Sequence, residues 1–139
     1  MPLTTSYFAV SRNLRGTKIS IARFHQPWIR NGIDEIMEEF SPSTNLLRFY
    51  KSQEINWGEF KKKYFNEQKK HYKEHPENFE NLLERAEEEN IILLCYERFE
   101  GRVTRCHRFL LYKFLNNIAK KEGYNVDFID ELPYEKMKK

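Results

Sequence analysis

Residues 93–112, LLCYERFEGRVTRCHRFLLY, gather side chains that could do chemistry into one short stretch of the sequence. These side chains are Tyr96, Glu97 and Arg98 after an apolar run, and Cys106, His107 and Arg108 before the next one. Histidine and glutamate transfer protons, whereas arginine offers a rigid fork of N–H donors to phosphate or carboxylate groups. The stretch therefore predicts an anion-binding site that also contains ionisable groups.

The elements around this stretch predict where the site lies. Residues 91–96 form a continuous apolar run, which is typical of a central parallel strand covered on both faces. Thr104 is expected to cap a helix that runs to about Glu122, with Gly123 as its stop. Ligands of open α/β sheets bind at the carboxyl ends of strands, where helix N-termini present free N–H groups. We therefore expect the site at this strand-to-helix junction.

Helical spacing of about 100° per residue orients the residues that begin this helix. His107 projects onto the inner face, Arg108 onto its edge, and Cys106 toward the polar side. We assign proton transfer to His107 and Glu97. The expected ligand-binding residues are Arg12, Arg23, Tyr96, Arg98, Cys106 and Arg108.

Each assignment has a structural alternative. His107 could be a core histidine bonded to a backbone carbonyl, and Arg108 could pair with Glu97. Cys95 lies inside the apolar run and is expected to be buried, inert packing. Cys106 lies near a helix N-terminus among arginines, which favours its thiolate.

Arginines are concentrated in two segments of the chain. Eight of the ten fall in residues 12–30 or 98–108, lysines dominate the middle, and residues 1–30 contain no acid. Two arginine-rich segments in one small domain predict one shared anionic ligand, with ion pairs to the plentiful glutamates as the alternative. The lysine and glutamate runs between them are interpreted as solvated surface.

Several familiar catalytic signatures are missing from the sequence. The position six residues after Cys95 is Gly101 and that after Cys106 is Tyr112, so neither cysteine begins a phosphatase loop. No glycine-rich phosphate loop, G-x-S-x-G motif or paired CxxC occurs. His71 and His75 are interpreted as an exposed helix end. We predict no metal and no cofactor.

Length and composition bound the fold. The 139 residues fit one domain spanning 1–139, in which residues 132–139 are expected to fray. Hydrophobic residues make up 40% and two cysteines occur, while no apolar run approaches the roughly 20 residues of a membrane span. We therefore expect a cytoplasmic, reduced protein that does not engage membranes.

The element pattern predicts an α/β domain with a mainly parallel sheet, flanking helices and a hairpin-like N-terminal strand pair. The pair comprises residues 5–10 and 18–24, with a turn over residues 13–17. Helices are expected at 32–40, from Asn56 to about residue 73, from Pro76 to about residue 90, and over 104–122, with a short element at 45–50 and a last strand at 125–129.

LLCYE, CHR, ISIARF and the SPS segment followed by Trp57 together resemble the domain of unknown function 488 family. The resemblance runs from about Tyr7 to Ile129 and implies a small prokaryotic protein with helices on both sides of an α/β sheet. The family's activity is not established. In many members the first strand ends in Asp-Val-Arg, whereas this chain has Ala9-Val10-Ser11-Arg12, so only Arg12 carries over.

Two classes of function remain open, and the sequence does not decide whether catalysis occurs. In the first, an enzyme acts on a phosphorylated or nucleotide-like small molecule. In the second, a nucleic-acid-binding module uses the acid-free N-terminal segment for phosphates and aromatic side chains for base stacking. Those aromatic residues are Tyr7, Phe8, Phe24 and Trp28. A partner-binding role with residues 32–50 as a dimer face is a third possibility, and the oligomeric state is undetermined.

Overall fold

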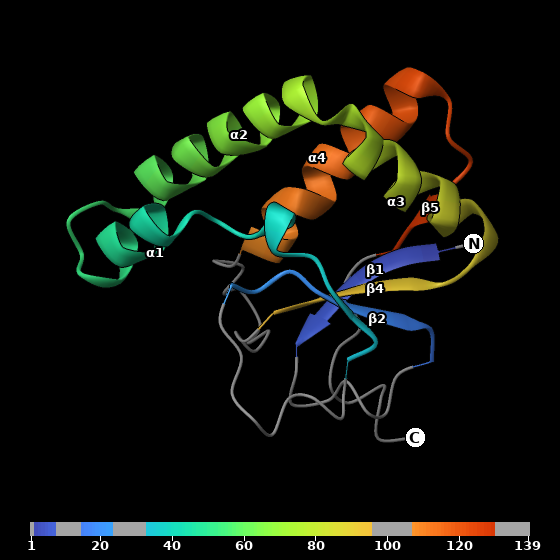
Figure 1. The fold of residues 1–139 in the computed structure, drawn as a ribbon, viewed down its shortest axis with the longest axis horizontal. Helices are drawn as coiled ribbons and strands as arrows, with labels where there is room; N and C mark the ends of the chain where they lie inside the picture. Colours follow the sequence, from blue (N-terminus) through green and yellow to red (C-terminus); the bar gives the residue numbers. More distant parts are fainter. Residues whose placement is uncertain (1, 8–14, 24–32, 96–106, 130–139) are drawn as a thin grey trace.

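The computed structural model describes residues 2–7, 15–23, 33–95 and 107–129 (Figure 1). Its strands form one parallel sheet in the order β3-β2-β4-β1-β5. The strands are β1 (Pro2–Tyr7), β2 (Thr17–Ser20), β3 (Glu35–Ile36), β4 (Ile91–Cys95) and β5 (Asp127–Phe128). The prediction of an α/β domain with a parallel sheet is confirmed, and β4 is its central strand.

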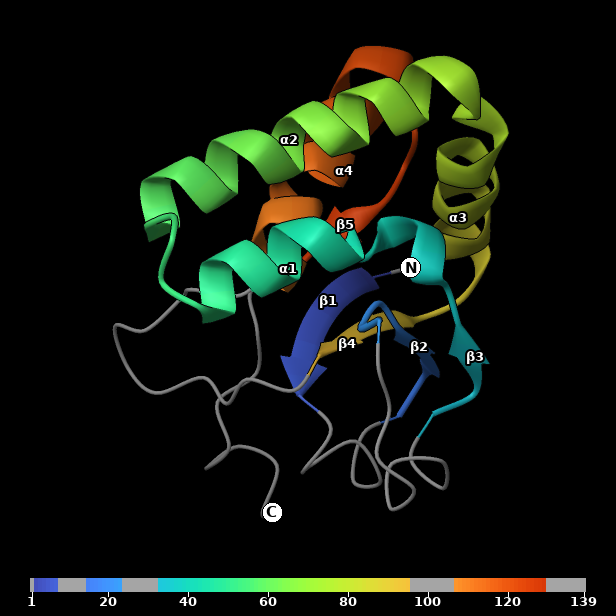
Figure 2. The same ribbon diagram turned by 60° about the vertical axis from the view of Figure 1, so that its left-hand side comes forward.

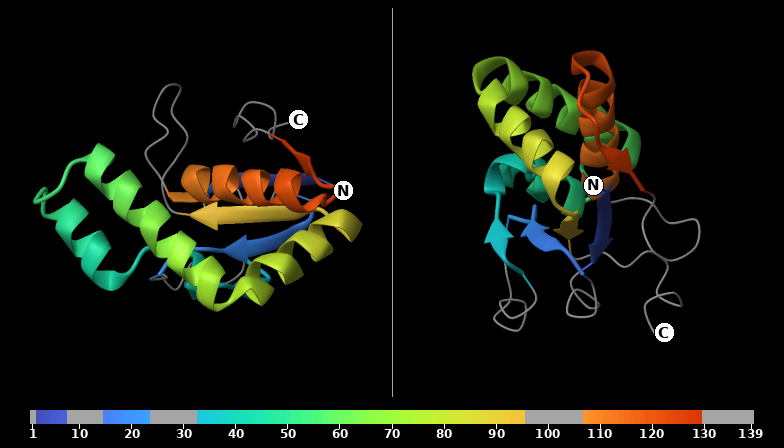
Figure 3. Two further views of the ribbon diagram at one scale, coloured as in Figure 1. Left: turned by 90° about the horizontal axis from the view of Figure 1, so that it is seen from above. Right: turned by 90° about the vertical axis from the view of Figure 1, so that its right-hand side faces the viewer.

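Four α-helices cover one face of this sheet (Figures 1 and 3). They are α1 (Thr44–Lys51), α2 (Trp57–Glu74), α3 (Pro76–Glu88) and α4 (His107–Glu122), and a 3-10 turn over Glu38–Phe40 precedes α1. Helices on both faces were expected, and within the described residues that expectation is met on one face only. None of these described helices has the length and apolar character needed to cross a membrane.

Local signals account for the helix ends. Asn56 and Glu59 form the predicted capping box at the start of α2, and Pro76 occupies the first turn of α3. Gly123 has φ +80° and ends α4, where its N–H and that of Tyr124 both bond the Ala119 carbonyl. The N-terminal end of α4 was predicted at Thr104, which lies outside the described residues.

The main core lies between the helices and one face of the sheet. Leu3, Ile19, Ile91 and Leu93 supply the sheet side of this core. The predicted inner stripe of α3 is fully buried against it and comprises Phe79, Leu82, Leu83 and Ala86. Ala22, Ile92 and Leu94 form a smaller cluster on the opposite face. Because its residues alternate between the two clusters, β4 is buried along its whole length, as its sequence predicted.

The prediction of a hairpin-like pair formed by the first two strands is wrong. β1 and β2 both pair in parallel with β4, which separates them, and Leu3 and Thr17 flank Ile91 on opposite sides. The predicted turn residue Gly16 instead marks a close backbone approach, since a Cβ there would lie 3.0 Å from the Asn90 carbonyl oxygen. The alternation of Ile19 and Ile21 identifies a buried face but carries no information about the neighbouring strand.

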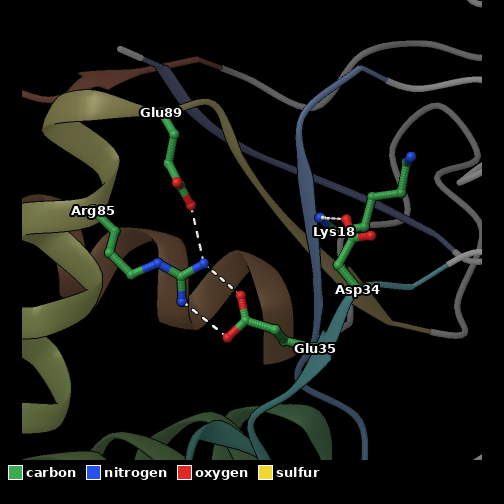
Figure 4. Close-up of polar contacts among 5 residues, drawn as sticks. All are labelled: Lys18, Asp34, Glu35, Arg85 and Glu89. Carbon is green, nitrogen blue, oxygen red and sulfur yellow. Dashed lines mark hydrogen bonds and ion pairs between the residues drawn. The ribbon is translucent and has the colours of Figure 1, made fainter.

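The predicted helix over residues 32–40 is also wrong for its described part, residues 33–40, which contain β3 and only the short 3-10 turn over Glu38–Phe40. Asp34 instead pins this segment to β2: its N–H donates to the Lys18 carbonyl at 2.8 Å, and its carboxylate accepts from the Lys18 N–H at 2.8 Å (Figure 4). The Arg85 guanidinium then bonds both carboxylate oxygens of Glu35. The backbone of this segment pairs with β2 instead of forming helical hydrogen bonds, and the ion pair holds Glu35 against α3. β3 therefore forms the edge of the sheet, as Figure 2 shows.

Candidate functional site

The carboxyl ends of β1 and β4 lie at a topological switch point of the sheet. The strand that follows β1 along the chain, β2, lies beyond β4, whereas β4 leads through α4 to β5 on the far side of β1. In open α/β sheets, ligands bind in the crevice that such opposite connections create. Cys95 is the last residue of β4 and pairs with Tyr7 there.

His107, the first residue of α4, lies buried at this position with 6% of its surface exposed. Its Nε2 atom is 2.6 Å from the carbonyl oxygen of Ile21, and its Nδ1 atom is 3.8 Å from the Cys95 Sγ atom. A carbonyl oxygen can only accept, so this bond assigns the proton to Nε2. In the neutral ring Nδ1 is therefore an acceptor that faces the Cys95 thiol.

This arrangement joins a thiol, a base and a group that orients the base. Transfer of the thiol proton to Nδ1 would leave an imidazolium beside a thiolate, the pairing by which a histidine activates a cysteine. The ring of Tyr64 packs on His107 with centroids 5.8 Å apart, and the Tyr64 hydroxyl donates to the Phe40 carbonyl at 2.7 Å. The imidazole is thus held by contacts from β2, β4 and α2.

Arg108 follows His107 in the first turn of α4 and is completely buried. The sequence predicted it at the edge of the inner face, and the structure places it fully inside. Its Cζ atom lies 4.5 Å from the centroid of the Phe109 ring, a distance at which a guanidinium is attracted to an aromatic face. Arginine is rarely buried to this degree without compensating contacts, so this position combines positive charge with low solvent access.

Arg23 lies two residues beyond Ile21, whose carbonyl oxygen bonds His107. Its Nε atom donates to the Pro42 carbonyl at 2.8 Å, and its Nη2 atom lies 3.5 Å from the Glu38 carbonyl. These bonds tie the end of β2 to the segment that leads into α1. Five further predicted site residues lie outside the described residues: Arg12, Tyr96, Glu97, Arg98 and Cys106.

The structure adds two groups that sequence reasoning missed. Cys95 is buried as predicted, with 5% exposed, but its sulfur faces a histidine rather than apolar atoms alone. The second is the Ile21 carbonyl, 86 residues from His107 in sequence. A usable signal for Cys95 was its place at the carboxyl end of the central strand, where functional groups of parallel sheets gather.

His71 and His75 do not form a ligand pair with each other. The Nδ1 and Nε2 atoms of His71 instead face Gln68 and Asn78, and His75 lies beside Glu77. The interpretation of both as an exposed helix end holds for His75, whereas His71 is half-buried. No cluster of three or more histidine, cysteine or acidic side chains suited to a metal occurs among the described residues.

The fold and these contacts define a small α/β domain whose polar side chains meet at the switch point of a parallel sheet. The chain belongs to the domain of unknown function 488 family, because it matches the family model described as "Active DUF488-N3 subclade" over residues 5–119. The resemblance inferred from the residues is thereby confirmed. No curated protein and no solved structure matches the chain.

Proposed function

We propose that the junction between β4 and α4 is an active site for an anionic small molecule of the phosphorylated or nucleotide-like class. In this site the Cys95–His107 pair moves a proton and Arg108 binds negative charge. The observation that carries the proposal is the attachment of both His107 ring nitrogens, one to a backbone carbonyl and one to a thiol, at the switch point.

Three physical arguments support a catalytic histidine over a purely structural one. The Ile21 carbonyl occupies Nε2, so it sets the tautomer and turns the basic nitrogen toward Cys95, as the third member of a catalytic triad does. His107 is 6% exposed, so solvent competes little with the thiol for Nδ1. A core histidine needs the carbonyl bond alone, whereas the thiol contact adds a second, reactive partner.

The start of α4 suits an anion for independent reasons. Its 16 residues present a positive dipole end here, and its first turn contains no acidic residue. The buried guanidinium of Arg108 adds a full charge with bidentate geometry. Phosphate or a carboxylate would complement both features.

Ligand binding is tested by calorimetry with inorganic phosphate and a panel of nucleotides and sugar phosphates, using wild type and the Arg108→Lys variant. Lysine keeps the positive charge but lacks the paired N–H donors of the guanidinium, so we expect the free energy of binding to weaken by about 2 kcal/mol. Lys113→Gln, on the exposed side of α4, is the matched control and should bind as wild type does. If no compound binds wild type more tightly than Arg108→Lys, the anion site is refuted.

The proton-transfer role is tested through the thiol. In a Cys106→Ser background Cys95 is the one remaining cysteine, and its alkylation rate near pH 7 can be followed by mass spectrometry. Glutamine at position 107 keeps an N–H donor for Ile21 but cannot accept the thiol proton, so His107→Gln should slow alkylation by about tenfold or more. Equal rates in both proteins would leave His107 with a structural role.

The second candidate function is nucleic-acid binding, which the exposed Arg15 in the acid-free segment of residues 1–30 favours. Five or so phosphate contacts would give a log-log salt dependence with a slope of roughly −4. A small-molecule site would show a much shallower dependence. Filter binding of mixed-sequence DNA and RNA across a salt series separates the two.

A further inference from the structure

A groove of about 610 Å³ lies between α2 and α4, on the solvent-exposed side of these helices, where Lys62 and Lys69 are exposed. Its floor is apolar and consists of Phe65, Tyr72, Phe114 and Ile118. The rings of Phe65 and Tyr72 each approach Phe114, with centroids 6.4 and 6.3 Å apart. The groove therefore presents a preformed aromatic surface on the outside of the helical layer.

The rim of the groove is basic. Lys62 and Lys69 stand one heptad apart on α2, and Lys121 faces them from the last turns of α4. The described residues that line the groove include no acid and no arginine. Glu80 and Glu122 act on Tyr72 at one end, where they add to the rise in the Tyr72 pKa that burial causes. The rest of the rim carries positive charge alone.

We infer that this groove binds an acidic amphipathic helix of a partner protein. From Lys62 to Tyr72 the groove follows α2 for about 15 Å, or roughly three helical turns. Apolar side chains at i, i+3, i+4 and i+7 of such a helix would contact the floor, and glutamates or aspartates beside them would reach the lysines. This site is separate from the β4–α4 junction and does not depend on its chemistry.

The floor and the rim both argue against nucleic acid as the occupant. Phe65, Tyr72 and Phe79 each pack against the Phe114 ring, so these rings are engaged with Phe114 rather than free to stack on splayed bases. Lysine is a mobile point charge that lacks the bidentate fork with which arginine binds phosphate, and it pairs readily with flexible surface carboxylates. A recessed apolar floor favours aliphatic side chains.

The test uses the full chain and a fluorescein-labelled helical peptide of about 14 residues, with leucines on one face and glutamates at the positions that flank this face. Fluorescence anisotropy measures its binding to wild type and to the groove variant Lys62→Glu/Lys69→Glu/Lys121→Glu. The matched control is Lys63→Glu/Lys70→Glu/Lys113→Glu, which has the same spacing on α2, the same change in charge and exposed positions outside the groove. Circular dichroism verifies that both triple variants are folded.

We expect the groove variant to bind at least about tenfold more weakly than wild type, and the control to stay within about threefold, because three attractive contacts become repulsive only in the groove. Equal losses in both variants, or no binding of the peptide to wild type, would overturn the inference. So would displacement of the peptide by mixed-sequence single-stranded DNA at lower concentration than by unlabelled peptide. A wild-type dimer that the groove variant alone converts to monomer in sedimentation would assign the groove to a second copy of this chain.

Discussion

His107 and His71 show how differently one side chain is used in two regions of this molecule. His107 is buried, and its partners come from the ends of β2 and β4, far apart in sequence. His71 lies half-buried on α2, where its Nδ1 atom is 3.3 Å from the Gln68 Oε1 atom and its Nε2 atom is 2.9 Å from the Asn78 Nδ2 atom. His71 thus has side-chain amide partners within seven residues of itself.

This difference separates an imidazole held by a backbone carbonyl from one held by side-chain amides. A backbone carbonyl cannot turn, so the tautomer of His107 is set by the sheet, whereas the amides of Gln68 and Asn78 can rotate when His71 changes its protonation. Burial lowers the pKa of His71, and the neighbouring His75 lowers it further. The buried His107 has a fixed orientation that suits proton transfer, whereas the lowered pKa of the half-buried His71 makes the stability of the fold depend on pH.

Tyr64 connects the two regions. Its ring packs on His107, and its hydroxyl bonds the carbonyl of Phe40, whose own ring lies 5.3 Å from that of His71. Substitutions at these positions therefore test whether the contrast between the histidines holds.

The largest effect should follow from His107→Leu. This change leaves the buried Ile21 carbonyl without its donor and should cost about 2 kcal/mol in the free energy of unfolding. His71→Leu removes a partner of the buried Gln68 and the half-buried Asn78, but both side-chain amides can rotate toward other partners, so it should cost about 1 kcal/mol or less. Urea denaturation measures the loss in the free energy of unfolding for both variants. Losses of similar size would show that His107 and His71 contribute equally to stability, against this contrast.

Tyr64→Phe should come next, at about 1.5 kcal/mol, because it removes a buried hydroxyl donor while keeping the ring. We also expect this variant to retain the Cys95 alkylation rate within about twofold, since the ring contact with His107 persists. Urea denaturation and the alkylation assay are the measurements. A large change in the alkylation rate with little loss of stability would show that the Tyr64 hydroxyl acts on the Cys95–His107 pair.

The pH dependence of stability should change in His71→Gln. Because the folded-state pKa of His71 is lowered, the unfolded chain binds more protons, so stability falls as the pH drops below the ordinary value of 6.5 toward the folded-state value. The variant should lose less stability than wild type over this window, by an amount smaller than either effect above. Thermal unfolding across a pH series measures it, with Lys63→Gln, at an exposed position of the same helix, as control.

The smallest effect should come from Glu35→Gln, which weakens the ion pair between β3 and α3 (Figure 4). The bonds to Glu35 are the main reason that the pKa of Arg85 is raised. Both side chains are more than 30% exposed, so we expect about 0.5 kcal/mol, and less at high salt. Glu88→Gln, exposed on the same helix, should be neutral, and a salt-independent loss would point to a packing effect instead.

The sequence by itself determined the features that depend on neighbouring residues. The capping box of α2, the glycine that ends α4 and the buried stripe of α3 follow from spacings within a few positions, so they could be read directly. The apolar run of β4 likewise identified a central strand. His107 was expected on the inner face of its helix, and it is buried there.

Only the tertiary structure decided which strands lie side by side and which groups meet His107. Strand pairing uses backbone hydrogen bonds that every residue offers, so the local pattern of β1 and β2 could not reveal that β4 separates them. The same sheet order brings Ile21 and Cys95 to His107 across 86 and 12 residues. No local periodicity records such a contact, because it exists only once the strands are assembled.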